Sequence, residues 1–279
     1  MKTLKKQTLI LLSISSLLLV GLAVFAHLHK KEEQANYSNL NSKASISEVR
    51  AILSKHLNEE SVDNFINLVT DYNDTVGSVG LSGSFAPFTK TDYDVEKISS
   101  LWTAKHGDFI GTNCRINTYT LLKGKIKIPQ VKSDTELLFQ DKDAIDKGKL
   151  FNAKDQANFD ILFSRVKTEA TQDVKVHAKH MEDYYKQFTF DDKARMLSVV
   201  VHDNLEGDSL FVGHVGVLVP TTDGYLFVEK LTFEEPYQAI KFASKKDCYK
   251  YLTTKYKDYT GPGLAKPFIM DNGKWVDMD

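Results

Sequence analysis

Residues 209–220 read SLFVGHVGVLVP, and this stretch decides the fold class together with its two neighbours. MLSVVVHD (196–203) precedes it and GYLFVEKLTF (224–233) follows it, and all three are rich in Val, Leu and Phe with polar residues between them. Such runs are typical of β-strands. The Asp223-Gly224 step readily supplies the positive φ angles of a hairpin turn, so we expect an antiparallel sheet in this part of the chain.

Helical patterns come before these strands. Ser45 and Glu48 have the spacing of a capping box, and apolar residues follow them at helical intervals. Further helices are expected from Ser61, from Tyr93 and, after the strands, from Ser244. Helices followed by an antiparallel sheet indicate the α+β class. We expect one domain over residues 45–279, in which the lysine- and aspartate-rich region 131–193 is a helical insertion.

The first residues of the chain predict export. Three lysines within residues 1–6 precede the uncharged run 7–26, which is the form of a signal peptide. A run of about 20 residues is also long enough to cross a bilayer, so an uncleaved anchor remains open. Residues 27–44 are polar and lack periodicity, as expected of a flexible tether. We therefore expect an extracellular, cell-surface or membrane-anchored protein.

Composition argues against several classes of partner. The chain has 36 Lys and Arg against 37 Asp and Glu without a basic stripe, so no nucleic-acid partner is expected. It has no phosphate loop and no dinucleotide fingerprint, and no cofactor is expected. His177, His180 and Glu182 are candidates for a metal site, but two histidines three residues apart without a third ligand more often form a solvated helix face. No metal is expected.

Cys114 stands at an unusual place for a cysteine that only fills a core. It lies in residues 111–124, GTNCRINTYTLLKG, where a small polar loop meets a helical pattern. At a helix N-terminus, free backbone N–H groups and the positive end of the helix dipole favour the thiolate, which is the nucleophilic form. The same N–H groups can donate to an oxyanion. A buried structural cysteine, or a disulfide with Cys248 in an exported protein, are the alternatives.

A nucleophilic thiolate needs a base, and His214 is the candidate. It lies in an apolar strand between Gly213 and Gly216, which would let a substrate or another backbone approach. Glu229 follows across the Asp-Gly hairpin and could lie beside His214 and orient its imidazole, which completes the logic of a triad. The alternatives are a structural histidine and a solvent-facing glutamate whose partner is Lys230.

The stretches TNCRINTY, GHVGVLV and FVEK resemble the papain-like bacterial cell-wall hydrolases, which include the NlpC-type peptidases and the cysteine, histidine-dependent amidohydrolases. The resemblance implies a papain-like core, in which a cysteine-headed helix packs on an antiparallel sheet that supplies the histidine and its orienting residue. The stretches FVEKLTFEEPYQAIKF (227–242) and KPFIMDNGKW (266–275) also resemble an uncharacterised family of exported bacterial proteins, which supplies no activity.

The resemblance implies an exported, surface-associated cysteine hydrolase that cleaves an amide bond in cell-wall peptide or another peptide-like substrate. Cys114 would attack the carbonyl, His214 would take and return the proton, and Glu229 would orient the imidazole of His214. Papain has a Gln donor six residues before its cysteine, but Asp108 stands there, so Asn113 or a backbone N–H would have to serve the oxyanion. Acyl or amide transfer, and a non-enzymatic surface-exposed binding module on the same scaffold, remain open.

Overall fold

A computed structural model describes residues 35–77, 79–89 and 92–278. The predicted export segment 1–26 lies outside these residues, as does the first part of the predicted tether, residues 27–34. In the part of the chain that is described, no helix is both long and apolar enough to cross a membrane.

The last part of the predicted tether is not a tether. Asn36–Ser38 form strand β1, which pairs with residues Ala239 to Lys241 on one side and with Ala86–Pro87 on the other. A first helix then begins at Lys43, capped by the side chain of Ser42, which accepts a hydrogen bond from the backbone N–H of Ser45. The tether prediction is therefore wrong from Asn36 onward, because a strand of three residues has no pattern of its own and takes its hydrogen bonds from distant partners.

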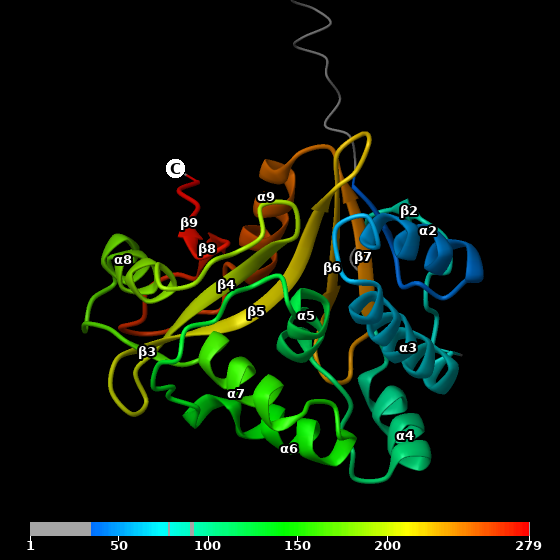
Figure 1. Ribbon diagram of the computed structural model, residues 1–279, viewed down its shortest axis with the longest axis horizontal. Helices are drawn as coiled ribbons and strands as arrows, with labels where there is room; N and C mark the ends of the chain where they lie inside the picture. Colours follow the sequence, from blue (N-terminus) through cyan, green and yellow to red (C-terminus); the bar gives the residue numbers. More distant parts are fainter. Residues whose placement is uncertain (1–34, 78, 90–91, 279) are drawn as a thin grey trace, which may run out of the picture. The chain divides into compact units, whose positions relative to one another are not determined.

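One antiparallel sheet of nine strands forms the centre of the described structure (Figure 1). Its strand order is β2-β1-β7-β6-β5-β4-β8-β9, and β3 pairs with β5 away from this path. The strands are β1 (Asn36–Ser38), β2 (Ala86–Pro87), β3 (Val166–Lys167), β4 (Arg195–Asp203), β5 (Ser209–Pro220), β6 (Tyr225–Lys230), β7 (Tyr237–Phe242), β8 (Phe268–Asp271) and β9 (Lys274–Trp275).

Eight helices accompany the sheet in the described residues. They are α2 (Lys43–Leu53), α3 (Glu59–Val76), α4 (Val95–His106), α5 (Cys114–Leu122), α6 (Phe139–Gly148), α7 (Ala153–Leu162), α8 (Val174–Tyr185) and α9 (Lys245–Tyr256). A mixed structure of helices and an antiparallel sheet was predicted and is confirmed. The expected hairpin joins β5 to β6, with register from Pro220↔Tyr225 to Val217↔Val228.

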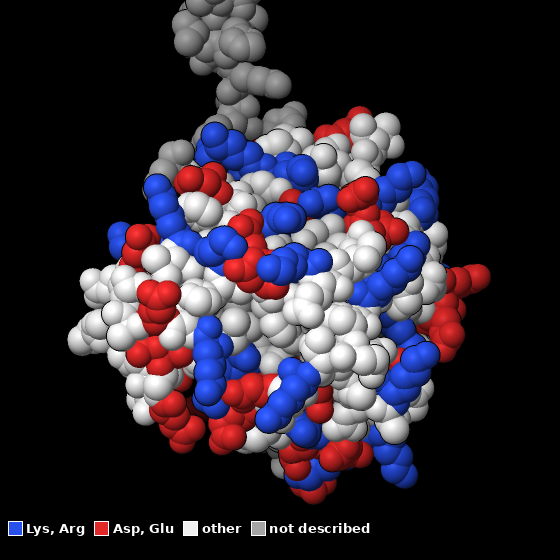
Figure 2. Space-filling view, turned by 60° about the vertical axis from the view of Figure 1, so that its left-hand side comes forward, with Lys and Arg blue, Asp and Glu red and all other residues white. Residues whose placement is uncertain are grey.

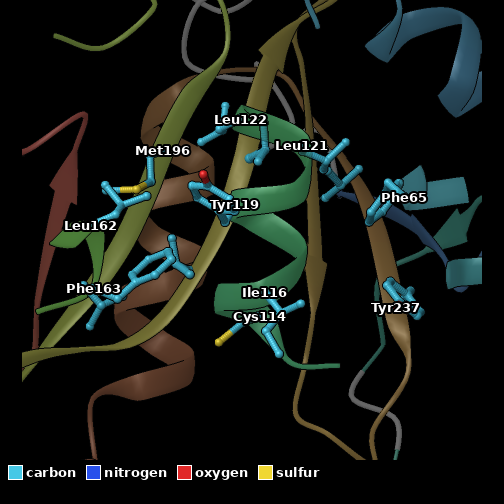
Figure 3. Close-up of a cluster of buried hydrophobic side chains, with 14 of the residues drawn as sticks. Phe65, Cys114, Ile116, Tyr119, Leu121, Leu122, Leu162, Phe163, Met196 and Tyr237 are labelled. Carbon is cyan, nitrogen blue, oxygen red and sulfur yellow. The ribbon is translucent and has the colours of Figure 1, made fainter. Parts of the chain in front are cut away.

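The two faces of the sheet bury two separate hydrophobic clusters. Val217 and Val219 of β5 belong to the larger cluster, which includes the buried side of α5, whereas Leu218 belongs to a smaller cluster under α9. This alternation follows from the two-residue period of a strand. Figures 1 and 3 show α5 on one face of the sheet and α9 on the other. In Figure 3, Cys114 lies at one end of α5, between side chains from α3 and β7 and those from α7 and β4.

The region 131–193 contains α6, α7 and α8, together with β3 and a 3₁₀ turn at Glu136–Leu138. Side chains from each of the three helices are buried in the same cluster as α5, among them Ile145, Phe159 and Met181. Strand β3 pairs with the beginning of β5. The region therefore contributes to the main core and, through α6, lies close to the head of α5.

Candidate functional site

Helix α5 begins at Cys114 because the residues before it form a cap. Asn113 is extended, and its Oδ1 accepts the backbone N–H of Ile116 at 3.0 Å, which is the bond of an N-cap residue. Gly111 has φ of +91°, and a Cβ there would lie 3.3 Å from the ring of Trp102, so the approach to the helix needs glycine. The thiol is thus the first side chain of the helix, as the sequence predicted.

At the head of α5, two backbone N–H groups near the thiol lack an acceptor within the helix. The first N–H groups of a helix have no intrahelical acceptor, and Asn113 satisfies only that of Ile116. The N–H groups of Cys114 and Arg115 therefore have no acceptor within the helix, which is the usual position of an anion-binding donor. Cys114 itself is 6% exposed, so the thiol lies just beneath the surface.

His214 and Glu229 lie where two strands part. The pairing of β5 with β6 extends only to Val217↔Val228, beyond which β5 continues along β4 while β6 continues along β7. His214 Nε2 and Glu229 Oε2 are 2.5 Å apart, and both side chains are buried. The hairpin therefore sets the carboxylate against the imidazole.

The structure brings Cys114 to the other side of the same imidazole. His214 Nε2 faces Glu229, which leaves Nδ1 as the ring nitrogen for the interaction with the thiol. Burial raises the pKa of Cys114, but the charge of His214, the hydrogen bond with it and the charge of Arg115 outweigh burial, and the pKa is lowered. For His214, burial lowers the pKa, whereas Cys114 and Glu229 raise it and prevail. Both shifts favour a thiolate beside an imidazolium.

Glu229 remains ionised although its side chain is fully buried. Burial alone would raise its pKa, but the charge of Lys255, the hydrogen bond and charge of His214, and the hydroxyl of Tyr251 lower it to about 2. Tyr251 Oη donates to Glu229 Oε1 at 2.5 Å, and Lys255 Nζ lies 3.4 Å from the same oxygen. In addition, the ring of Tyr256 stacks on His214, with centroids 4.8 Å apart.

Asn113 does not have the geometry of the expected oxyanion donor. Its Oδ1 caps α5, and its Nδ2 donates to Asp141 of α6 at 2.7 Å. Arg115 holds the same carboxylate through Nε (2.9 Å) and Nη2 (2.6 Å), and its Nη1 donates to the Val212 carbonyl of β5. This placement does not support the oxyanion role of Asn113, and it makes Asp141 the point where α5, α6 and β5 are joined.

Lys230 is not the partner of Glu229. Its Nζ donates to the carbonyls of Thr232 (2.8 Å), Phe233 (3.1 Å) and Glu235. The ammonium also lies over the ring of Tyr72, 4.2 Å from its centroid. Burial lowers the pKa of Lys230 to about 7. Through its bonds to these three carbonyls, Lys230 stabilises the turn between β6 and β7.

The remaining candidates lie elsewhere. His177 is fully buried, with Nδ1 on the Thr168 hydroxyl (2.7 Å) and Nε2 on the Thr171 carbonyl (2.8 Å). Within residues 35–77, 79–89 and 92–278, no group of three potential metal ligands is present. The side chain of Asp108 is 85% exposed and pairs with Lys147.

The two cysteines are separate free thiols. Cys248 belongs to α9 and to the cluster on the opposite face of the sheet from α5. Burial raises its pKa well above the ordinary value, so Cys248 is the less reactive thiol of the two.

Several residues of the site were not found from the sequence. No motif around Tyr251, Lys255, Tyr256 or Asp141 assigns these residues to a site with Cys114. Tyr251 and Lys255 stand four residues apart on one helix, which places them on one face. That spacing was the available signal, but it does not say which strand the face meets.

The charges on the surface are mixed. Figure 2 shows Lys and Arg interspersed with Asp and Glu over the face that it presents. No field of a single sign spans this face.

The chain was compared with protein families, curated proteins and solved structures. A family model described as "Domain of unknown function (DUF4300)" matches residues 36–276. No curated protein and no solved structure matches the chain.

Proposed function

Because the chain belongs to the DUF4300 family, whose description names no activity, we propose its function from the geometry of the site: a cysteine hydrolase that cleaves an amide bond. The observation that carries the proposal is the position of His214. One ring nitrogen meets the buried carboxylate of Glu229 at 2.5 Å, and the same histidine acts on the Cys114 thiol through its charge and a side-chain hydrogen bond. A nucleophile, a base and an orienting group joined in this order are what covalent catalysis at a carbonyl requires.

The proposed reaction begins with the ion pair. The Cys114 thiolate attacks the carbonyl carbon of the amide, and the tetrahedral intermediate collapses as the His214 imidazolium gives its proton to the leaving amine. A thioester remains on Cys114. Neutral His214 then takes a proton from water, whose oxygen attacks the thioester, and the thiolate leaves as the carboxylic acid is released. Glu229 keeps its charge throughout and stabilises the imidazolium.

The oxyanion would be met at the head of α5. The N–H of Cys114 has no acceptor within its own helix, and it carries the partial positive charge of the helix N-terminus. Donors in this position act on the charge that develops during attack. The N–H of Arg115 lies next along the turn and is the second available donor.

The finer features of the proposal come from the resemblance and from the N-terminal sequence. A papain-like core is supported by α5 packed against β5 and β6, with the histidine and glutamate on adjacent strands. Export to the cell surface rests on the basic and then apolar segment within residues 1–26. Cell-wall peptide, or another peptide-like amide, is the substrate class that these two features favour together.

The test is amide cleavage in purified bacterial cell wall. Wild-type protein, Cys114→Ala and Cys248→Ala would be incubated with the wall, and newly exposed amino groups would be measured. We expect release by wild type and by Cys248→Ala, and none by Cys114→Ala. Equal release by all three would remove Cys114 from the reaction. Adding an amine acceptor separates hydrolysis from transfer, since transfer forms a new amide instead of a free acid.

A second candidate is a non-enzymatic binding module on the same scaffold. It is favoured by the low exposure of Cys114, 6%, and by the engagement of Asn113 with Asp141. Cys114 would then be a core residue whose neighbour, His214, is paired with Glu229. This alternative predicts that a bulky thiol reagent fails to reach Cys114 in the native protein while a small neutral one reaches it only on unfolding.

A further inference from the structure

Helix α9 lies on the face of the sheet opposite to α5 (Figure 3), and it contacts the Glu229–His214 pair. Three of its residues touch the pair: Tyr251 and Lys255 at the carboxylate, and Tyr256 at the imidazole. Leu252 of the same helix is fully buried in the cluster beneath, which anchors the helix on the sheet. The polar contacts of α9 are therefore held by packing.

The two oxygens of Glu229 have different partners. Oε2 faces His214 Nε2, and Oε1 receives Tyr251 Oη at 2.5 Å with Lys255 Nζ at 3.4 Å. A carboxylate with no exposed surface is costly to keep charged unless each oxygen has a donor. The division of partners also fixes the plane of the carboxylate, and with it the direction in which Oε2 presents its charge.

The α9 contacts form a connected chain. Lys255 Nζ donates to Tyr251 Oη at 2.8 Å, and Tyr251 Oη donates onward to Glu229. A hydroxyl that accepts from an ammonium becomes a stronger donor, so the two bonds reinforce each other. The side chain of Lys255 is 29% exposed, and it therefore brings a solvated positive charge to the rim of a buried site.

We propose that Tyr251 and Lys255 are positioning residues, which hold Glu229 charged and aimed at His214 so that the Cys114 thiolate forms at lower pH. This inference rests on the proposed function and deepens it, since it assigns the regulation of the same site to a helix far from Cys114 in sequence. Neither residue touches the reacting atoms. They act through the carboxylate.

Several ionisable groups surround Glu229, His214 and Cys114. The carboxylate of Glu229, on β6, is contacted by His214 of β5 and by Tyr251 and Lys255 of α9. Cys114 and His214 face each other, with Tyr256 stacked on the imidazole. The charge of Arg115 favours the thiolate of Cys114, and that of Asp141 opposes it. Burial, and then the charge of Glu229, raise the pKa of Cys248. Burial lowers the pKa of Lys230, and the charge of Cys114 is among the influences that oppose this.

The direction of the effect follows from these contacts. Without a donor at Oε1, the carboxylate is no longer held in its plane, and Oε2 presents its charge less directly to His214, so the imidazolium is stabilised less. Each substitution should therefore move the pH at which Cys114 is half-reactive upward, by about one pH unit for a lost charge-assisted hydrogen bond.

The experiment measures the rate of Cys114 alkylation by iodoacetamide from pH 4 to pH 9, identified by peptide mass, in the purified full-length protein. Tyr251→Phe keeps the ring and removes the hydroxyl, and Lys255→Met keeps the length and removes the charge. Tyr249→Phe is the matched control, because Tyr249 donates to the carboxylate of Asp271 at 2.5 Å from the same helix. Lys246→Met controls for the loss of an exposed α9 charge.

The outcomes separate the two proposals. Upward shifts in Tyr251→Phe and Lys255→Met, with none in the controls, support the inference. If Cys114 is activated in the wild-type protein and the pH midpoint of its alkylation is unchanged in both variants, the inference is overturned and the proposed function stands. A wild-type thiol that reacts only near pH 8.5, as an ordinary thiol does, overturns both. Thermal unfolding of each variant, compared with its control, shows whether a shift reflects lost packing.

Discussion

Asp141 is the residue whose loss should destabilise the head of α5 most. Its carboxylate has no exposed surface and accepts from Arg115 Nε, Arg115 Nη2 and Asn113 Nδ2, at 2.9, 2.6 and 2.7 Å. The Arg115 side chain is only 14% exposed. Asp141→Ala would leave the guanidinium buried without its counter-charge, which typically costs about 3–5 kcal/mol.

The expected loss converts into a large thermal shift. For a domain of this size, each kcal/mol lowers Tm by roughly 2–4 °C, so Asp141→Ala should unfold about 6–20 °C earlier. Urea unfolding followed by circular dichroism would give the free energy directly. Asp141→Asn should lose nearly as much, because the amide keeps the shape and removes the charge.

The control is an ion pair at the surface. Asp71 pairs with Lys105 at 2.8 Å, and the two side chains are 40% and 48% exposed. Asp71→Ala should cost less than about 1 kcal/mol. The double variant Arg115→Met/Asp141→Leu should recover part of the loss, since no unpaired charge remains. A cost for Asp141→Ala no greater than that for Asp71→Ala would refute the reasoning.

Three further outcomes are expected. Gly216→Ala should lower the free energy of unfolding by about 1–3 kcal/mol, because its Cβ would lie 2.7 Å from Phe227 Cε2; urea unfolding measures this. Burial lowers the pKa of His177 below 6.5, so its contribution to stability is present above that pH and is lost in acid; the stability advantage over His177→Gln should shrink from pH 7 to pH 5. Burial lowers the pKa of Lys230 from 10.5 to about 7, so stability relative to Lys230→Met should rise from pH 7 to pH 10.

Local chemistry explains which parts of the fold could be predicted. The β5–β6 hairpin has an Asp-Gly turn between two apolar runs, and Gly224 adopts φ of +153° there. The start of α5 has an asparagine cap directly before Cys114. In both places the signal lies within a few residues of the structure that it determines, so the sequence alone was sufficient.

Other features depend on contacts between distant segments. The amide of Asn113 is chemically suited to either a cap or an oxyanion site, and Asp141, 28 residues away, decides between them. Tyr251 reaches Glu229 only because α9 docks against this part of the sheet. Strand β1 has three residues, and its hydrogen bonds come from β7, so no local pattern distinguishes it from a tether. These features could not be predicted because docking, and not local propensity, determines them.

The pairing of Cys114 with His214 is the central claim, and the pH dependence of Cys114 alkylation tests it most directly. The rate would be measured in the native protein and in His214→Ala, with Cys248 as the internal reference. The account predicts rapid labelling of Cys114 that persists well below the free-thiol pKa of about 8.5 and slows sharply in His214→Ala. Labelling that rises only near pH 8.5, at the same rate in both proteins, would contradict it.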